Sequence, residues 1–278
     1  MYGLHKNDLL RRRLPALLLG VNFAICLGGL GTDVLAATDS EVPSEAKAPC
    51  VIATQNDLLT WMTYYYLHPQ PDLLVPALLY ADKQGLLDSD GRAPLMAFVS
   101  QVFTQNPGKI KLWVEQLDGL KPTTRPMLWT ALYWSPTKEA AEALDKIIQA
   151  LPAKAQAELK SQTAHPSEPV EKMAIATPAV LDELWGSFCA TGDERYVNRL
   201  LTVLPWCDSD GKDITKLMIG GAAKWSLTSN AEQHPRVMKI CLKARDTQPE
   251  LKKILTEVID SAEKHARERI ESKKPVVR

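Results

Sequence analysis

The 278-residue chain has little glycine, few aromatic side chains and no excess of charge of either sign. It contains 14 Gly, 6% aromatic residues, and 33 Lys and Arg against 33 Asp and Glu. Such sparse glycine excludes a fibrous protein, and the hydrophobic fraction of 45% excludes a disordered one. A nucleic-acid binder needs a surplus of Lys and Arg gathered on one face. We therefore expect a globular protein with no nucleic acid among its partners.

The sequence also lacks the motifs of common chemistries. It has no H-E-x-x-H string for a zinc site, no G-x-S-x-G elbow for a hydrolase serine and no C-x-x-C pair. The string GGAAKW at 220–225 lacks the spacing and the final Lys-Ser/Thr of a phosphate-binding loop. We therefore assign no catalytic, cofactor-binding or metal-ligating residue and expect no cofactor. An enzyme without a recognisable motif stays open as an alternative, although we favour a non-enzymatic role.

Histidines and acidic turns give weak signals only. No two of the four histidines after residue 36 lie within four residues of each other: His68, His165, His234 and His265. We expect His68 and His234, each beside a proline in a turn, to be solvated or to cap a helix. The string DSDG occurs at 88–91 and 208–211, but a calcium loop needs Gly at its sixth position and an acidic twelfth residue. Ordinary helix-ending turns are expected at both.

The first 36 residues predict an export signal. Basic residues at Lys6 and 11–13 precede an apolar run at 14–30, and Val-Leu-Ala at 34–36 suits a signal peptidase. The alternative is an anchor in the inner membrane, but the run is interrupted and shorter than the ~20 residues that span a bilayer. We expect cleavage after Ala36, a periplasmic or secreted protein with no membrane contact after signal removal, and a flexible leader at 37–54.

The remaining sequence is helical in pattern and repeats itself. Five segments each contain an apolar helix, a short polar turn and a second helix with apolar residues spaced i, i+3, i+4, i+7. The five stripes are Leu73, Pro76, Ala77 and Tyr80; Ile110, Trp113, Val114 and Leu117; Ala140, Ala143, Leu144 and Ile147; Val197, Leu200, Leu201 and Leu204; and Val237, Ile240, Cys241 and Ala244. Bulky aromatic residues precede the turns, including Trp61, Phe98, Trp129, Trp185 and Trp225.

This repeat predicts an all-α fold of about five stacked helical hairpins, resembling an α-solenoid. A single hairpin cannot cover its own apolar faces, whereas stacked hairpins can. The alternative is an irregular helical bundle. Hairpins 1 to 3 are expected at 55–151, and an irregular connection at 152–178 with a short helix over 153–162. Hairpins 4 and 5 with a charged C-terminal capping helix follow at 179–278.

The hairpin period of about 34 to 40 residues, and above all LWGSFCATGDERYVNRLLTVLP at 184–205, resembles tetratricopeptide-type repeats. The stretches at 190–201 and 222–237 also resemble exported proteins of Gram-negative bacteria without an established activity, some of which are labelled translation initiation factors. The resemblance implies stacked hairpins and brings no catalytic residues. The label does not fit this chain, since a GTP-binding factor needs a phosphate-binding loop.

Four cysteines remain after the signal: Cys50, Cys189, Cys207 and Cys241. In a stacked array only neighbouring units bring two Cα atoms within the ~7 Å that a disulfide requires. We expect at most one bridge among the last three, with Cys207–Cys241 slightly favoured, and Cys50 free or paired with another molecule. The alternative is reduced thiols packed in the core. A reactive Cys189–His234 pair would need the fold to join them, and we expect Cys189 to be a buried structural residue.

Three function classes follow. We favour a protein- or peptide-binding module or scaffold in the cell envelope, whose concave face, lined by some of the Trp and Tyr residues, engages an unidentified protein partner. An enzyme without a recognisable motif is the second class. A structural subunit of an envelope assembly is the third, and an exposed apolar patch would indicate it.

Overall fold

The computed structural model describes residues 51–87, 91–208 and 213–272. Within these ranges the chain forms twelve α-helices and no strand, which confirms the all-α prediction. The predicted export signal and most of the leader lie outside the described residues, as do Cys50 and the central residues of both DSDG strings. Among the described helices, none combines the length and the apolar character needed to cross a bilayer.

Ten of the helices follow one another as five two-helix units. The units are α1 (Gln55–Tyr64) and α2 (Leu74–Lys83); α3 (Arg92–Gln105) and α4 (Ile110–Gln116); α5 (Arg125–Trp134) and α6 (Lys138–Ala150); α8 (Pro178–Thr191) and α9 (Glu194–Leu201); and α10 (Ile214–Gln233) and α11 (Pro235–Thr247). Between the third and fourth units lies α7 (Ala153–Gln162), with the bounds expected from the sequence. The chain ends in the long helix α12 (Lys252–Ser272).

Five short 3₁₀-helices connect these elements: η2 (Pro71–Leu73), η3 (Pro107–Lys109), η4 (Val170–Lys172), η5 (Leu204–Asp208) and η6 (Pro249–Leu251). Three of them begin with proline and lead directly into an α-helix. Proline suits this position because its fixed φ matches the first helical turn, where its missing N–H is not needed. The prolines of η2 and η3 therefore start the second helices of the first two units, and the proline of η6 starts α12.

Local side-chain chemistry fixes several helix ends. The Asp57 amide donates to Oγ1 of Thr54 (3.1 Å) and the Thr54 amide donates to the Asp57 carboxylate (2.8 Å), which makes a capping box at the start of α1. Helix α8 ends at Gly192, whose φ of 66° lies in the left-handed region. Glycine adopts this conformation without the steric cost that a side chain would bring.

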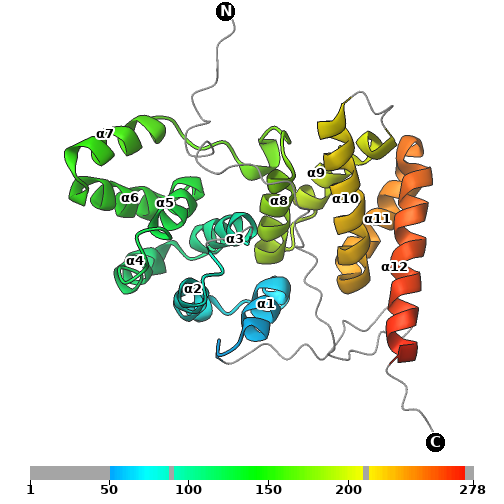
Figure 1. Cartoon of the computed structure of the whole chain (residues 1–278), viewed down its shortest axis with the longest axis horizontal. Helices are drawn as coiled ribbons and strands as arrows, with labels where there is room; N and C mark the ends of the chain where they lie inside the picture. Colours follow the sequence, from blue (N-terminus) through cyan, green and yellow to red (C-terminus); the bar gives the residue numbers. More distant parts are fainter. Residues whose placement is uncertain (1–50, 88–90, 209–212, 273–278) are drawn as a thin grey trace, which may run out of the picture.

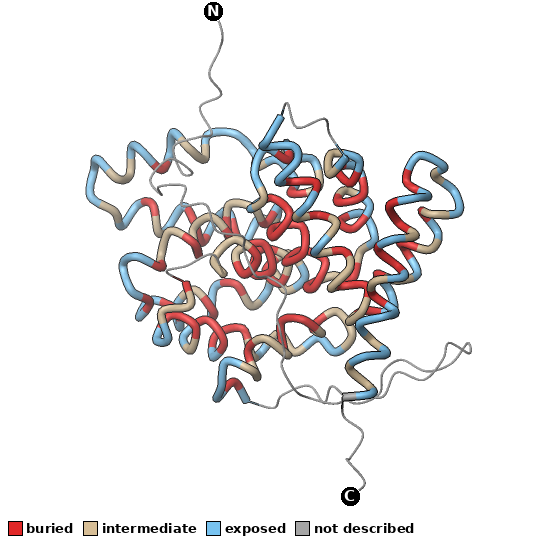
Figure 2. Tube along the Cα trace, turned by 45° about the vertical axis from the view of Figure 1, so that its right-hand side comes forward, coloured by how far each residue is buried: buried red, intermediate tan, exposed pale blue. Residues whose placement is uncertain are grey.

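The centre of the molecule is the contact between α3 and α8 (Figure 1). Helices α5, α6 and α7 lie on one side of this pair, and α10, α11 and α12 lie on the other. A Cβ atom at Gly186 in α8 would lie 2.0 Å from the carbonyl oxygen of Pro94 in α3, so only glycine permits the close approach. Buried positions concentrate in this central region, and exposed ones dominate the outer helices (Figure 2).

Four of the five predicted apolar stripes lie in the core, with only Val114 and Ile147 half-buried among them. The first stripe is wrong by about one residue. The buried side of α2 consists of Leu74, Ala77, Leu78 and Ala81, whereas Pro76 is exposed. The turn η2 occupies 71–73, so α2 begins later than the pattern suggested, and a shift of one residue rotates the buried face by about 100°.

Candidate functional site

The described residues hold no group of three or more His, Cys, Asp or Glu side chains placed to bind a metal ion. Of the four described histidines, His68, His165 and His265 are exposed on separate elements, and His234 is buried. Three features remain as candidates for function. They are a buried aromatic junction, a polar cluster at the start of α9 and an apolar face of α10.

The aromatic junction consists of Tyr64, Tyr66, Phe188 and His234. The three aromatic rings lie 5.4 to 5.8 Å from the His234 ring, measured between centroids. The Tyr66 hydroxyl lies 3.2 Å from Nδ1 of His234, and the Tyr66 amide donates to the carbonyl oxygen of Cys189 (3.0 Å). The first unit therefore meets the fourth and fifth units here. The expectation that residues distant in sequence are distant in space does not hold at this junction.

His234 is neither solvated nor a side-chain cap, so that expectation is wrong. The residue is 0% exposed and its side chain makes no capping hydrogen bond to α11. The turn between α10 and α11 is this one residue, and the end of α1 with the turn that follows it covers the imidazole. Burial lowers the pKa of His234 to about 4, so the imidazole is neutral at neutral pH. Its Nε2 atom has no hydrogen-bond partner.

Cys189 and His234 both contact Tyr66, the first through its backbone carbonyl and the second through Nδ1. Their chemistry is the reverse of a catalytic pair, because a nucleophilic cysteine reacts as the thiolate. Burial raises the pKa of Cys189 to about 12, and the His234 imidazole is held neutral. The pair is therefore inert near neutral pH, and Cys189 is the buried structural residue expected from the sequence.

Gly192 keeps the junction closed. A Cβ atom at this position would lie 2.7 Å from Cδ2 of Tyr66, so the Tyr66 ring packs directly on the glycine backbone. The same residue needs its positive φ to end α8. One glycine thus serves both the helix end and the contact between distant units.

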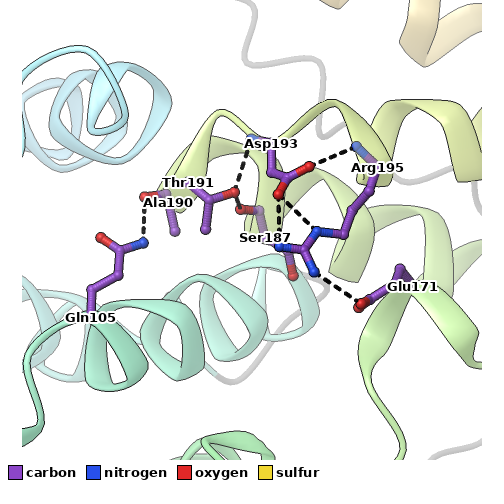
Figure 3. Close-up of polar contacts among 7 residues, drawn as sticks. All are labelled: Gln105, Glu171, Ser187, Ala190, Thr191, Asp193 and Arg195. Atoms are coloured by element: carbon purple, nitrogen blue, oxygen red, sulfur yellow. Dashed lines mark hydrogen bonds and ion pairs between the residues drawn. The ribbon is translucent and has the colours of Figure 1, made fainter.

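The polar cluster ties the start of α9 to the connection before α8 (Figure 3). The Asp193 carboxylate accepts hydrogen bonds from the Arg195 amide (2.9 Å) and from Nε of the Arg195 guanidinium (2.8 Å). Arg195 Nη1 lies 3.3 Å from Oε1 of Glu171 in η4. On the other side of the cluster, Gln105 of α3 donates to the Ala190 carbonyl (3.1 Å).

These contacts are structural. The hydrogen bond from Arg195 lowers the pKa of Asp193, so its carboxylate stays charged and caps α9. The Thr191 hydroxyl accepts from the Asp193 amide (3.1 Å) and donates to the Ser187 carbonyl (2.8 Å), as Figure 3 shows. Each charged group of the cluster already has a partner within the chain, which leaves it little capacity for a ligand.

The third feature is an apolar face of α10. Seven large hydrophobic residues are exposed in the described part of the chain: Val51, Leu79, Leu112, Ile214, Leu217, Met218 and Trp225. The last four lie on α10 and are 69%, 38%, 44% and 44% exposed. With Gly221 they are spaced i, i+3, i+4, i+7 and i+11, which places them on one side of the helix within about 100°. We call these five residues the α10 face.

The opposite side of α10 faces the core. Its buried residues include Ile219, Ala223, Leu227 and Ala231. A Cβ atom at Gly220 would lie 2.2 Å from the Cys207 amide nitrogen, so this glycine lets η5 pack directly against α10. A Cβ atom at Gly221 would meet nothing within 4 Å. Gly220 thus has a packing reason within the chain, and Gly221 leaves the helix backbone bare in the middle of the α10 face.

One lysine borders the α10 face, and it has a partner. Lys224 lies 2.5 Å from Glu257 of α12, which runs beside α10 (Figure 1). Lys216 lies on the other side of α10, where its Nζ is 5.7 Å from the centre of the Trp206 ring in η5. The border therefore carries a charge that is neutralised within the chain. An apolar strip with a polar rim is the usual composition of a protein-binding surface.

Sequence reasoning missed this face. The sequence marked Trp225 only as an aromatic residue ahead of a turn, and the structure shows that it is exposed. The other six tryptophans are buried or half-buried, so their side chains form the core rather than an aromatic-lined surface. The signal was present, because the spacing of 214, 217, 218, 221 and 225 is itself a helical stripe. A second stripe on a helix that already has a buried one is the pattern to look for.

The three described cysteines, Cys189, Cys207 and Cys241, are free thiols. The favoured Cys207–Cys241 bridge is therefore absent, and the alternative of packed, reduced thiols is what these residues show. Cys189 and Cys241 are buried in the core, whereas Cys207 is half-buried beside Asp208.

Comparison with known proteins yields no match: no family model, no curated protein and no solved structure is significantly similar to this chain. The class of protein is therefore defined by the fold alone, as an all-helical protein built from two-helix units. The resemblance to tetratricopeptide-type repeats stays a prediction.

Proposed function

We propose that this protein is an exported, tetratricopeptide-like helical-repeat protein that acts as a protein- or peptide-binding module or scaffold in the cell envelope. Its docking surface is the α10 face, and its partner presents an apolar side of a helix. The observation that carries the proposal is the row of four exposed apolar side chains around Gly221. Export to the periplasm or the exterior rests on the sequence pattern of residues 1–36.

The physical basis is hydrophobic burial. Covering apolar surface is worth roughly 25 cal/mol per Å², and a soluble protein that keeps such a strip exposed on one helix forgoes this stabilisation. A partner helix laid along α10 would bury the strip. Helix-in-groove and helix-on-helix contacts use anchors at this same i, i+3, i+4, i+7 spacing. A structural subunit of an envelope assembly would use such a face in a permanent contact.

The chemistry of the interior supports a binding role over catalysis. The most suggestive pair of side chains, Cys189 and His234, is held in the neutral thiol and neutral imidazole forms by burial. The side chains of the polar cluster around Asp193 make their hydrogen bonds and ion pairs with other groups of the same chain. The α10 face is the feature that packing among the described residues does not explain.

Site-specific photo-crosslinking tests the proposal. A photoreactive amino acid replaces Trp225 in one variant and Leu112 in a control variant, since Leu112 is 55% exposed on α4 and lies outside the α10 face. We expect covalent adducts with a defined protein at position 225 and not at 112 in living cells. The adduct protein, once identified and purified, should bind Trp225→Ser at least about tenfold more weakly than it binds the wild type. Equal adduct yields at 225 and 112 would refute the role of the face.

A further inference from the structure

We infer that the α10 face is covered by the α10 face of a second copy of this chain, in an antiparallel pair related by a two-fold axis. The inference rests on the proposed function, because it names the partner of the same docking surface. Four observations carry it. They are the sizes of the side chains along the strip, the exposed glycine Gly221, the ion-paired Lys224 at the border, and the surface area of the strip.

The strip is complementary to itself. Leu217 and Trp225 each lie four residues from Gly221, about 6 Å along the helix axis on either side of it. A two-fold axis beside Gly221 therefore places Trp225 of one copy opposite Leu217 of the other, and the same contact occurs twice. Such an isologous arrangement closes on itself and leaves no free apolar face for further association.

Gly221 gives the pair its closest point. A glycine inside a helix costs about 1 kcal/mol relative to alanine. Gly220 offsets this cost by admitting η5, but nothing in the described chain lies within 4 Å of a Cβ atom at position 221. Two helices that cross at glycine approach each other more closely, which lets the flanking Leu217, Met218 and Trp225 side chains interlock.

The charges at the border suit an identical partner. Lys224 is ion-paired with Glu257 of its own chain, so it does not need an acidic group on the partner. In the antiparallel pair Lys224 lies opposite Met218, so like charges do not face each other at the border. The whole chain carries 33 basic and 33 acidic side chains, so two copies do not repel at long range.

The area predicts a reversible dimer. One helix contributing four large side chains buries roughly 500 Å² on each copy, which is near the lower limit for a specific interface. We therefore expect a dissociation constant of about 10 μM, a value that corresponds to weak and exchangeable association.

Sedimentation velocity of the protein as expressed from the full chain tests the inference between about 1 and 200 μM. We expect a shift from monomer to dimer over this range. Trp225→Ser and Gly221→Glu should raise the dissociation constant at least about tenfold, the second by placing two carboxylates at the crossing point. Leu112→Ser, which removes an exposed apolar residue on α4 outside the α10 face, should leave the dissociation constant unchanged. Circular dichroism serves as the control for folding, and we expect each variant to be folded because the substituted positions are exposed.

The pairing geometry has its own test. In a Cys50→Ser, Cys207→Ser background, Gly221→Cys should form an interchain disulfide under mild oxidation with diamide, and Leu112→Cys should not. A dimer that persists in Gly221→Glu and Trp225→Ser overturns the inference. A protein that stays monomeric at 200 μM also overturns it. If the monomer still forms the specific crosslinks from position 225 to another protein, the proposed function survives the loss of this inference; if it forms none, both fall.

Discussion

Tyr66 and His234 are 168 positions apart in the chain, and the hydroxyl of one lies 3.2 Å from Nδ1 of the other. The contact joins the turn that follows α1, inside the first two-helix unit, to the single residue between α10 and α11. It is lined by aromatic rings and closed at one side by Gly192. The protein is therefore held together across its length at a buried, titratable group.

This arrangement predicts a pH-dependent stability. The pKa of His234 is about 4 in the folded protein and near 6.5 in an exposed imidazole. Between these values the unfolded chain binds a proton that the folded chain does not, so the free energy of unfolding falls as the pH is lowered from 6.5 to 4. The loss over this window is of the order of 3 kcal/mol. Urea denaturation followed by circular dichroism between pH 4 and 8 measures it.

His234→Gln should flatten the decline, because glutamine does not titrate. His68→Gln, at an exposed position, should keep the wild-type profile. The difference between the wild-type and His234→Gln curves isolates this group from the carboxylates that titrate nearby in pH. Parallel curves for the two proteins would mean that His234 does not control the acid side of the profile.

The contact between α3 and α8 predicts a strongly destabilising glycine substitution. In Gly186→Ala the new methyl group would lie 2.0 Å from the Pro94 carbonyl oxygen, which is backbone and cannot rotate away. The two central helices must separate, at a cost of about 3 kcal/mol. Gly119→Ala is the matched control, since nothing lies within 4 Å of its Cβ, and its effect should stay within about 0.5 kcal/mol. Similar unfolding free energies for the two variants would contradict the close approach.

Thiol reactivity separates the described cysteines. Burial raises the pKa of both Cys189 and Cys241 to about 12, so neither supplies a thiolate to a maleimide reagent in the folded protein. Cys207 is half-buried and should react first. Labelling at pH 8 followed by peptide mapping should find the label on Cys207 under native conditions and on all three after denaturation. Native labelling of Cys241 at the rate of Cys207, or a disulfide between them, would contradict the structure.

The polar cluster predicts different losses of stability for three substitutions at Asp193 and Arg195. Asp193→Ala removes the cap of α9 and should lower the free energy of unfolding by about 1 kcal/mol. Asp193→Asn keeps an acceptor for the Arg195 amide and should cost clearly less. Arg195→Ala should also cost less, about 0.5 kcal/mol, because its side chain is 54% exposed and water screens its ion pairs. Thermal denaturation at neutral pH compares the three variants. An equal loss of unfolding free energy in all of them would mean that the cap on α9 is not the cause of the destabilisation.

The sequence was sufficient to predict the all-α class and most of the buried stripes, because apolar residues that recur every three to four positions lie on one side of a helix, and that side packs in the core. It failed for α2, where the 3₁₀ turn at 71–73 changes the starting point of the helix. Such a turn is a local matter of one or two hydrogen bonds, and the apolar pattern of Leu73, Leu74, Val75 and Ala77 fits two registers.

The sequence pattern could not predict the burial of His234 at the aromatic junction or the exposure of the α10 face, and the two reasons differ. Whether His234 is solvated depends on Tyr66, a residue in another unit, and local sequence carries no information on that contact. The α10 face was visible as a stripe, but a stripe does not reveal whether it faces the core or the exterior. Only the packing of η5 and α12 around α10 decides which of its two apolar sides is covered.

The central pair of helices has a consequence for the order of folding. Gln105 at the end of α3 and Ala190 in α8 are 85 residues apart, so a chain emerging from the ribosome presents α3 long before α8 exists. Unit-by-unit growth from the N-terminus cannot complete the core, because the contact between α3 and α8 closes a long loop, and contacts of such sequence separation slow folding. Until α8 is made, the side of α3 that packs against it, at Pro94 opposite Gly186, stays uncovered and is a natural binding site for a chaperone.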